Sequence, residues 1–307
     1  MGRDPDGLLL LDKPAGISSA AALNRVKRLT GARKAGHTGT LDPFATGLLV
    51  CCLGRATRLS RFFLEGDKQY AATLRLGVET DTQDRTGTVT AERPVPPLTP
   101  DEIEAAFAPF RGTFSQEPPA YSALKHEGVP LYRLARKGKP VQKPPRRVAV
   151  RELAVKEIRP PEIDFTVTCS AGTYIRTLAV DVGRRLGPGA HLSALRRTAS
   201  GGLTLDRAVA LEGLAELTEA GRLSSAMIHM AEALPLPVFR ADEALARRIL
   251  HGNPLTAADL PGATADEGGH LQVLAPDGRM LAVLRREMDQ KYAYDCVLAA
   301  PGTRNDN

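Results

Sequence analysis

A single carboxylate, Asp42, stands in a segment built mostly of glycine, threonine and proline, AGHTGTLDPFATG at residues 35–47, with His37 just upstream. Pro43 disfavours helical backbone at the residue before it, so Asp42 is predicted to be extended. A carboxylate held in this way suits a nucleophile, a general base or a metal ligand. It equally suits a turn residue whose side chain bonds its own backbone, the common case for Asp-Pro in a loop.

Several other chemistries are not indicated by the sequence. The glycine-rich segment lacks the GxxxxGK[ST] pattern of a phosphate-binding loop, and His37 and Asp42 have no second histidine or acid pair nearby for a metal. The four cysteines show no CxxC spacing. We therefore expect no metal site and no disulfide framework, and we interpret the cysteines as buried reduced thiols.

Four more residues have side chains suited to a site. Arg176 lies in CSAGTYIRTLAVD, where a strand is predicted to give way to a helix, and its guanidinium would favour the ionised form of a nearby carboxylate. Tyr174 in the same motif and Tyr70 in DKQY offer aromatic faces for a base, and Lys68 offers a charge for a phosphate. For Arg176 a surface arginine is an equally open alternative, and for Tyr174, Tyr70 and Lys68 taken singly a purely structural role is the simpler one.

The positive charge of the chain is local. The net charge is +6, yet the segment from Lys125 to Arg147 alone holds eight Lys or Arg and one acid, Glu127. Lys125 and Arg133 belong to this segment, and we interpret it as a grip on RNA phosphates rather than a solvated flap. Contact with about 6 phosphates would give log K against log salt a slope of roughly −4 to −5.

Apolar periodicity and capping signals predict the elements that would position these residues. Strands are expected at 7–11, 48–53, 70–76 and 163–169, and helices from Ser18 or Ser19 to Thr30, from Thr99 onward, near 131–137, at 173–186 and at 241–251. Residues 36–47 are expected to form a loop and residues 81–93 a polar, turn-rich stretch. A hairpin is expected to turn at Asp277-Gly278.

The pattern changes at LPLP, residues 234–237, which is typical of a linker. We expect a first domain over 1–233, with the basic insertion near 122–147, and a small β-rich domain over 234–307. The longest apolar run near the N-terminus, Leu8–Leu11, is too short for a signal peptide or a membrane span. We therefore expect a cytoplasmic protein without membrane contact.

Six motifs in a fixed order closely resemble the bacterial tRNA pseudouridine synthases of the TruB family. They are LLLLDKPAGISS, AGHTGTLDPFATGLL, DKQYAATLRLGVETDTQD, PPAYSALKHEGVPLYRLARKG, CSAGTYIRTLAVDVG and GAHLSALRRT. The resemblance implies an α+β fold with a mixed, largely antiparallel central sheet flanked by helices, and a PUA-like RNA-binding module at the C-terminus. It also implies isomerisation of uridine 55 in the T loop of tRNA to pseudouridine.

The same resemblance assigns roles to individual residues. The family's nucleophile falls on Asp42, its arginine partner on Arg176 and its base-stacking tyrosine on Tyr70. The remaining matches, all expected to contact the substrate RNA, are an RNA-contacting histidine, two further pocket positions and the lysine of the KPAG turn; these are His37, Tyr174, Leu195 and Lys13.

The implied reaction breaks the C1′–N1 bond, turns the base and forms a C1′–C5 bond, so nothing is oxidised and no cofactor is expected. The target must first leave its stack, at about a few kcal/mol, and His37 or Leu195 would fill the vacated space. Attack at C1′ and attack on the base ring both stay open.

We expect a monomer that acts on the T stem-loop of tRNA without an obligate protein partner. Two alternatives are a tRNA-folding chaperone without turnover and a hydrolase that releases free uracil.

Overall fold

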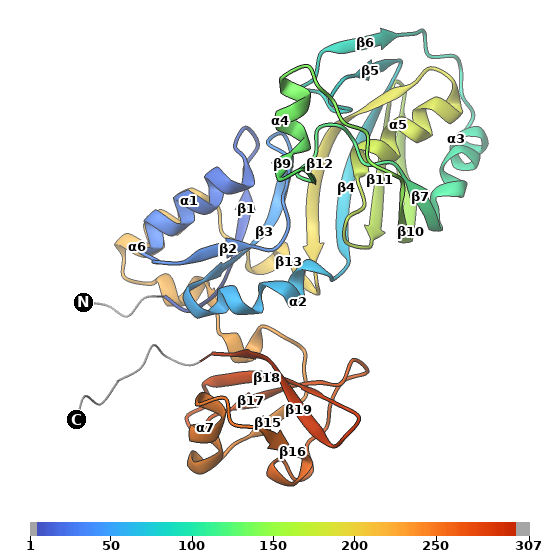
Figure 1. The fold of residues 1–307 in the computed structure, drawn as a ribbon. Helices are drawn as coiled ribbons and strands as arrows, with labels where there is room; N and C mark the ends of the chain where they lie inside the picture. The colour runs from blue at the N-terminus through green and yellow to red at the C-terminus, as the bar shows by residue number, and fades with distance from the viewer. Residues whose placement is uncertain (1–4, 299–307) are drawn as a thin grey trace.

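The computed structural model describes residues 5–298, which form two main β-sheets, two short hairpins and the helices that flank them (Figure 1). The larger sheet has ten strands, and the order along its main path is β14-β1-β3-β12-β4-β11-β10-β7, with β2 beside β3 and β13 beside β12. Only the β3–β12 contact in this sheet is parallel, so the expected mixed, largely antiparallel sheet is confirmed. The strands of this sheet are β1 (Gly7–Lys13), β2 (Ala35–His37), β3 (Thr46–Leu53), β4 (Lys68–Leu76), β7 (Gly112–Gln116), β10 (Arg146–Arg159), β11 (Glu162–Cys169), β12 (Ala190–Ser200), β13 (Leu203–Thr204) and β14 (Met227–Ile228).

Helices cover the sheet in two groups. α3 (Pro100–Phe107) and α5 (Ile175–Leu186) pack on β4, β10 and β11 through one apolar core, and α1 (Ser19–Thr30) and α6 (Leu211–Glu219) pack beside β1 through another (Figure 1). The predicted caps explain where two helices begin. Ser18 accepts a hydrogen bond from the main chain of α1, and Thr99 with Glu102 forms a capping box at α3. The other helices are α2 (Ser60–Leu64), α4 (Leu131–Arg136) and α7 (Glu243–Leu250).

The smaller sheet has its own core, and it docks on the larger unit. Its order is β15-β17-β18-β19-β16, and the predicted hairpin at Asp277-Gly278 joins β17 to β18. An apolar cluster shared by the two units includes Leu8, Leu48 and Val283, and Arg61 pairs with Asp295 at 2.9 Å. The strands are β15 (Val238–Arg240), β16 (Leu255–Thr256), β17 (His270–Leu274), β18 (Met280–Arg286) and β19 (Lys291–Val297).

Most predicted elements are confirmed, and three expectations need correction. β2 occupies residues 35–37, at the start of the segment expected to be a loop. β5 (Val78–Thr80) and β6 (Val89–Glu92) form a hairpin, so part of the stretch expected to be turns is a strand. β10 was not foreseen, because two β-bulges interrupt its alternation of buried and exposed residues.

The predicted domains extend beyond the described part of the chain at residues 1–4 and 299–307. Within residues 5–298, no helix combines the length and the apolar character needed to cross a membrane. The basic insertion forms a small hairpin of β8 (Lys125–His126) and β9 (Val129–Pro130), which leads into α4. In Figure 1 this excursion stands beside β12 and above the larger sheet.

The loop between β2 and β3 is tied to the start of α1 by a buried serine. The Ser19 hydroxyl accepts a hydrogen bond from the Leu41 N–H at 2.7 Å and lies 2.9 Å from the Leu41 carbonyl, to which it donates. Ser19 is 1% exposed, so water cannot replace these bonds. The serine therefore fixes the backbone of the residue that precedes Asp42.

Ser19→Ala should lower the free energy of unfolding by about 1–3 kcal/mol, because two buried main-chain groups lose their partner. It should also remove the protection of the Leu41 amide from hydrogen exchange. Ser18→Ala is the matched control, since it removes only the helix cap, at about 1 kcal/mol, and should leave Leu41 protected. Urea unfolding and amide exchange of the three proteins test this. Equal protection of Leu41 in both variants would contradict it.

Candidate active site

Asp42 and Arg176 form an ion pair between the β2–β3 loop and the first turn of α5. Arg176 Nε lies 2.8 Å from one carboxylate oxygen of Asp42, and Nη2 donates to the other at 3.3 Å. This two-point contact fixes the carboxylate in plane with the guanidinium. The alternative of an Asp42 side chain turned back on its own loop is wrong, because both carboxylate oxygens contact Arg176.

Arg176 is buried and held from three further sides. Its Nη1 donates to the Thr82 carbonyl at 2.7 Å, and its Nη2 donates to the Tyr121 carbonyl at 2.8 Å. A second carboxylate, that of Asp84, lies 3.9 Å from Nε. The arginine is 4% exposed, which excludes the alternative of a surface residue. Its position is therefore determined before any substrate binds.

Lys13 and Arg197 hold the loop that carries Asp42 through hydrogen bonds to its main-chain carbonyls. The Lys13 ammonium is buried and donates to the carbonyls of Pro14 and Ile17 at 2.8 and 2.9 Å, and it lies 3.4 Å from that of Pro43. Arg197, also buried, donates to the main-chain carbonyls of Leu48 and Gly39. Lys13 was expected to contact RNA; in this structure its ammonium bonds the turn and the loop that it joins.

Tyr70 and Leu195 lie on the same face of the sheet as the ion pair. Tyr70 on β4 stands opposite Arg197 on β12, and Leu195 stands opposite Ala72 two positions along β4. Burial raises the pKa of the Tyr70 phenol, the charge of Arg197 lowers it, and the charge of Asp42 raises it slightly further. The contacts therefore join Asp42 to Arg176, and the strand register places Tyr70 and Leu195 on neighbouring strands of the sheet.

His37 and Tyr174 border this centre. His37 ends β2, and its Nδ1 is buried without a hydrogen-bond partner among residues 5–298. A buried polar atom without a partner is rare in proteins and suits a group that completes its bonding with substrate. Tyr174 immediately precedes α5, with the Arg146 guanidinium 4.7 Å from its ring centroid.

The three lysines and arginines expected to contact phosphates differ in their surroundings. Lys125 in β8 and Arg133 in α4 are exposed on the excursion. Lys68 is buried, and its ammonium donates to the carbonyls of Phe63, Leu64 and Gly66. Lys68 therefore closes the C-terminal end of α2, in contrast to the exposed Lys125 and Arg133.

Burial and charge oppose each other at Asp42. Desolvation raises the pKa of the Asp42 carboxyl above its ordinary value, Arg176 lowers it, and the negative charge of Asp84 raises it again. The side chain keeps 32% of its surface exposed, so a ligand can reach it. Desolvation also lowers the pKa of Lys13 to about 8 and lowers that of His37, which favours a neutral imidazole.

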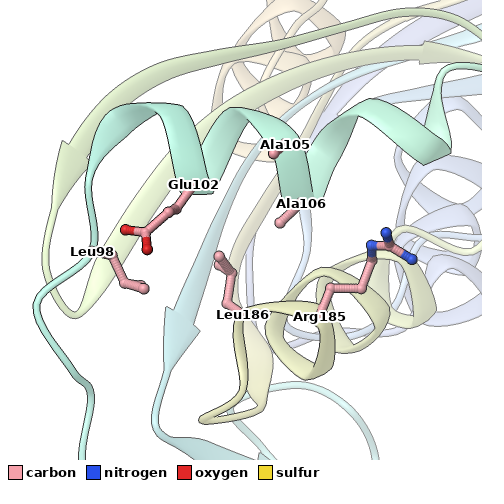
Figure 2. Close-up of a pocket in the computed structure, with 6 residues that line it drawn as sticks. All are labelled: Leu98, Glu102, Ala105, Ala106, Arg185 and Leu186. Atoms are coloured by element: carbon pink, nitrogen blue, oxygen red, sulfur yellow. The ribbon is translucent and has the colours of Figure 1, made fainter.

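Two cavities help to define where a ligand can lie. One of about 440 Å³ is lined by Leu195 and Phe44 and by the cationic side chains of Arg85, Lys156 and Arg196. The other, of about 520 Å³, lies between α3 and α5, and its lining includes Glu102 and Arg185 (Figure 2). Arg185 is nine residues after Arg176, about 14 Å along the helix, so this second cavity is separate from the ion pair.

Sequence reasoning missed Asp84 and Arg197. Asp84 is buried and accepts hydrogen bonds from the Thr82 hydroxyl and the Thr86 N–H, both at 2.9 Å. The turn sequence DTQDRTG gave a signal for such a bonded aspartate, but nothing showed that it faces Arg176. Arg197 lies in a strand with no local sign of burial.

Comparison with known proteins places the molecule among the pseudouridylate synthases. The family model described as TruB family pseudouridylate synthase (N terminal domain) matches residues 27–175, and that described as tRNA pseudouridylate synthase B C-terminal domain matches residues 176–235. The chain belongs to the TruB family, and the resemblance carried by the six motifs is confirmed.

Curated relatives and solved structures cover nearly the whole chain. The chain is 50% identical over 285 residues to tRNA pseudouridine synthase B of Burkholderia mallei, covering 91% of this chain and 93% of that protein. The protein of the same name from Cupriavidus metallidurans is 47% identical over 289 residues, covering 92% of this chain and 91% of that protein. The structure of a Cbf5-Nop10-Gar1 complex aligns with a TM-score of 0.74 at 26% identity, covering 95% of this chain and 85% of that chain.

The ion pair predicts a pH effect. Arg176→Gln removes the charge that lowers the pKa of Asp42, so the acid limb of the rate profile should move up by about 1–3 pH units. The sign follows from the carboxylate being the reactive form: a higher pKa means that activity is lost at a higher pH as the solution is acidified.

Single-turnover rates of the conversion implied by the family, uridine to pseudouridine, measured from pH 5 to 9, test this prediction. Arg184→Gln is the matched control, because Arg184 lies on the same helix and pairs with Glu79 at 3.0 Å, away from Asp42. An acid limb that stays in place in Arg176→Gln would contradict the assignment.

Proposed function

We propose that this chain isomerises uridine 55 in the T loop of tRNA to pseudouridine, with Asp42 as the nucleophile. The observation that carries the proposal is the two-point pair of Asp42 with a buried Arg176, at 2.8 and 3.3 Å, in a chain of the TruB family. The relatives named tRNA pseudouridine synthase B support tRNA as the substrate.

Each side chain of the centre has a task in this reaction. Asp42 supplies the attacking oxygen, and Arg176 holds it in place and favours its ionised form. Tyr70 offers its ring to the base while the base is detached from the sugar. Water must be kept from C1′, since otherwise the sugar would be hydrolysed, and burial around the pair serves this purpose.

The flipped nucleotide is held by residues around the centre. We assign His37 to contact with the RNA, supported by its unpartnered Nδ1. Leu195, which lines the cavity of about 440 Å³, is assigned to the wall of the base pocket, and Tyr174 is assigned to the same pocket from the family motif alone. Lys125 and Arg133 bind phosphates from the exposed excursion. Lys13 and Lys68 take structural roles in place of the RNA contacts expected for them.

The two sheets support a division of the chain near residue 234. We assign 1–233 to catalysis and 234–307 to a small PUA-like RNA-binding domain, since the strands of the larger sheet end at Ile228 and those of the smaller begin at Val238. Because one chain then supplies both nucleophile and RNA contacts, we propose a monomer that acts in the cytoplasm without a protein partner. Turnover by the purified chain alone tests this.

Asp42→Asn should abolish isomerisation, a loss of about 10⁴-fold or more, while tRNA affinity stays within about twofold, since an amide cannot attack but fills the same space. Release of tritium from tRNA labelled at carbon 5 of uridine measures turnover, and filter binding measures affinity. Asp101→Asn, an exposed position on α3, is the control. Turnover near wild type in Asp42→Asn, or free uracil as the wild-type product, would refute the proposal.

Replacing Arg133, Lys137 and Lys139 with Gln should weaken tRNA binding and make the slope of log K against log salt shallower by about 2–3, because fewer counterions are released. The matched control replaces Arg25, Lys27 and Arg28, three exposed cations of α1, and makes the same change in net charge. Kd measured at several salt concentrations checks this. Equal slopes in the two triple variants would rule out a specific grip by the excursion.

A further inference from the structure

The first turn of α5 carries Arg176 but has no side-chain cap of its own. The residue before the helix is Tyr174, whose side chain accepts no capping hydrogen bond. Main-chain groups at a helix start need a partner from elsewhere when they are buried. For Tyr174 that partner is Gln116, the last residue of β7.

Gln116 holds the main chain of Tyr174 at two points. Its Nε2 donates to the Tyr174 carbonyl at 3.0 Å, and its Oε1 accepts from the Tyr174 N–H at 2.8 Å. The side-chain amide of Gln116 thus bonds both the N–H and the carbonyl of Tyr174, as a residue of a neighbouring antiparallel strand would. Gln116 is 1% exposed, so the two bonds are shielded from water and geometrically strict.

Arg146, the first residue of β10, holds the same short segment from another side. Its guanidinium lies 4.7 Å from the centroid of the Tyr174 ring, and its Nη2 donates to the Gly172 carbonyl. Gly172 has φ of +86°, and a side chain there would lie 3.2 Å from the guanidinium carbon of Arg146. Arg146 therefore differs from the other cations of the basic segment, because it faces the helix start.

Gln116 and Arg146 are the strand residues between which the chain leaves the sheet, over residues 117–145, to form the basic excursion. They are opposite each other in the antiparallel ladder of β7 and β10, and the chain leaves the sheet after one and returns at the other. Within the excursion, the carbonyl of Tyr121 accepts a hydrogen bond from Arg176 Nη2 at 2.8 Å. The excursion thus contacts the catalytic arginine and its helix at three points.

We propose that Gln116 and Arg146 are positioning residues that couple the basic excursion to Arg176, so that RNA held by the excursion keeps the catalytic pair aligned. This rests on the function proposed above. Because Tyr174 is two residues before Arg176, any shift of the two strand ends moves the backbone that carries the guanidinium. A misplacement of about 1 Å can slow a reaction by about 10²-fold, so the coupling acts on rate more than on affinity.

Gln116→Leu and Gln116→Glu separate a positioning role from a merely structural one. Leucine removes both bonds. Glutamate keeps the acceptor for the Tyr174 N–H, but it donates to the Tyr174 carbonyl only when protonated. Single-turnover rates at saturating enzyme, tRNA affinity and the melting temperature are measured for both variants between pH 5 and 9.

We expect Gln116→Leu to lose about tenfold or more in rate with Kd within about twofold of wild type. The rate of Gln116→Glu relative to wild type should rise as the pH falls, because protonation restores the donor. Arg146→Gln should likewise lose more in rate than in affinity. Gln272→Leu is the control: Gln272 is also buried and bonds main-chain carbonyls, but in the smaller sheet, and its loss should lower only the melting temperature.

Wild-type rates in Gln116→Leu, or losses confined to Kd, would overturn the proposal. If the leucine variant does not fold, the glutamate variant decides, and a relative rate that does not change with pH counts against the coupling. These outcomes are distinct from failure of the proposed function, which would appear as absence of pseudouridine formation by the wild-type protein.

Discussion

The ion pair between Asp42 and Arg176 joins segments 134 positions apart in the chain, and the surrounding structure serves to hold its two ends. On the Asp42 side, Lys13, Ser19 and Arg197 grip the loop through its main chain. On the other side, two carbonyls hold the guanidinium and a glutamine holds the helix start. Nearly all of these contacts are to main-chain atoms, so they set positions without competing for the carboxylate.

The second carboxylate gives the pair its chemical character. An arginine cannot lose its proton in a protein, so Arg176 stays positive beside both Asp42 and Asp84. The distances are unequal, 2.8 Å to Asp42 and 3.9 Å to Asp84, and Asp84 is further satisfied by the turn that contains it. Because Asp84 shares the cation and burial adds to its effect, the pKa of Asp42 lies above its ordinary value, so the carboxylate is more basic than in a simple pair, which suits a nucleophile.

The sequence predicted the parts of this site better than their assembly. Caps at Ser18 and Thr99 and the alternation of β11 are local signals, and the corresponding elements formed as expected. The role of Asp42 and its pairing with Arg176 came from family resemblance, since no local pattern joins residues so distant. The burial of Lys13 and Lys68 could not be foreseen, because the sequence does not distinguish a lysine that donates to main-chain carbonyls from one that binds phosphates. Gln116 gave no signal, since its partner is a backbone segment 58 positions away.

Titration of the Asp42 carboxyl, followed by its side-chain ¹³C resonance in the wild-type protein, tests the central claim most directly. The account predicts one transition at a pH above the ordinary aspartate pKa of 3.8. It also requires an ionised carboxylate at pH 7, because the charged form is the nucleophile. Replacement of Asp84 by Asn should move that transition to lower pH, because the charge that raises it is gone. A carboxyl that is still protonated at pH 7, or a transition that does not respond to Asp84, would contradict the account.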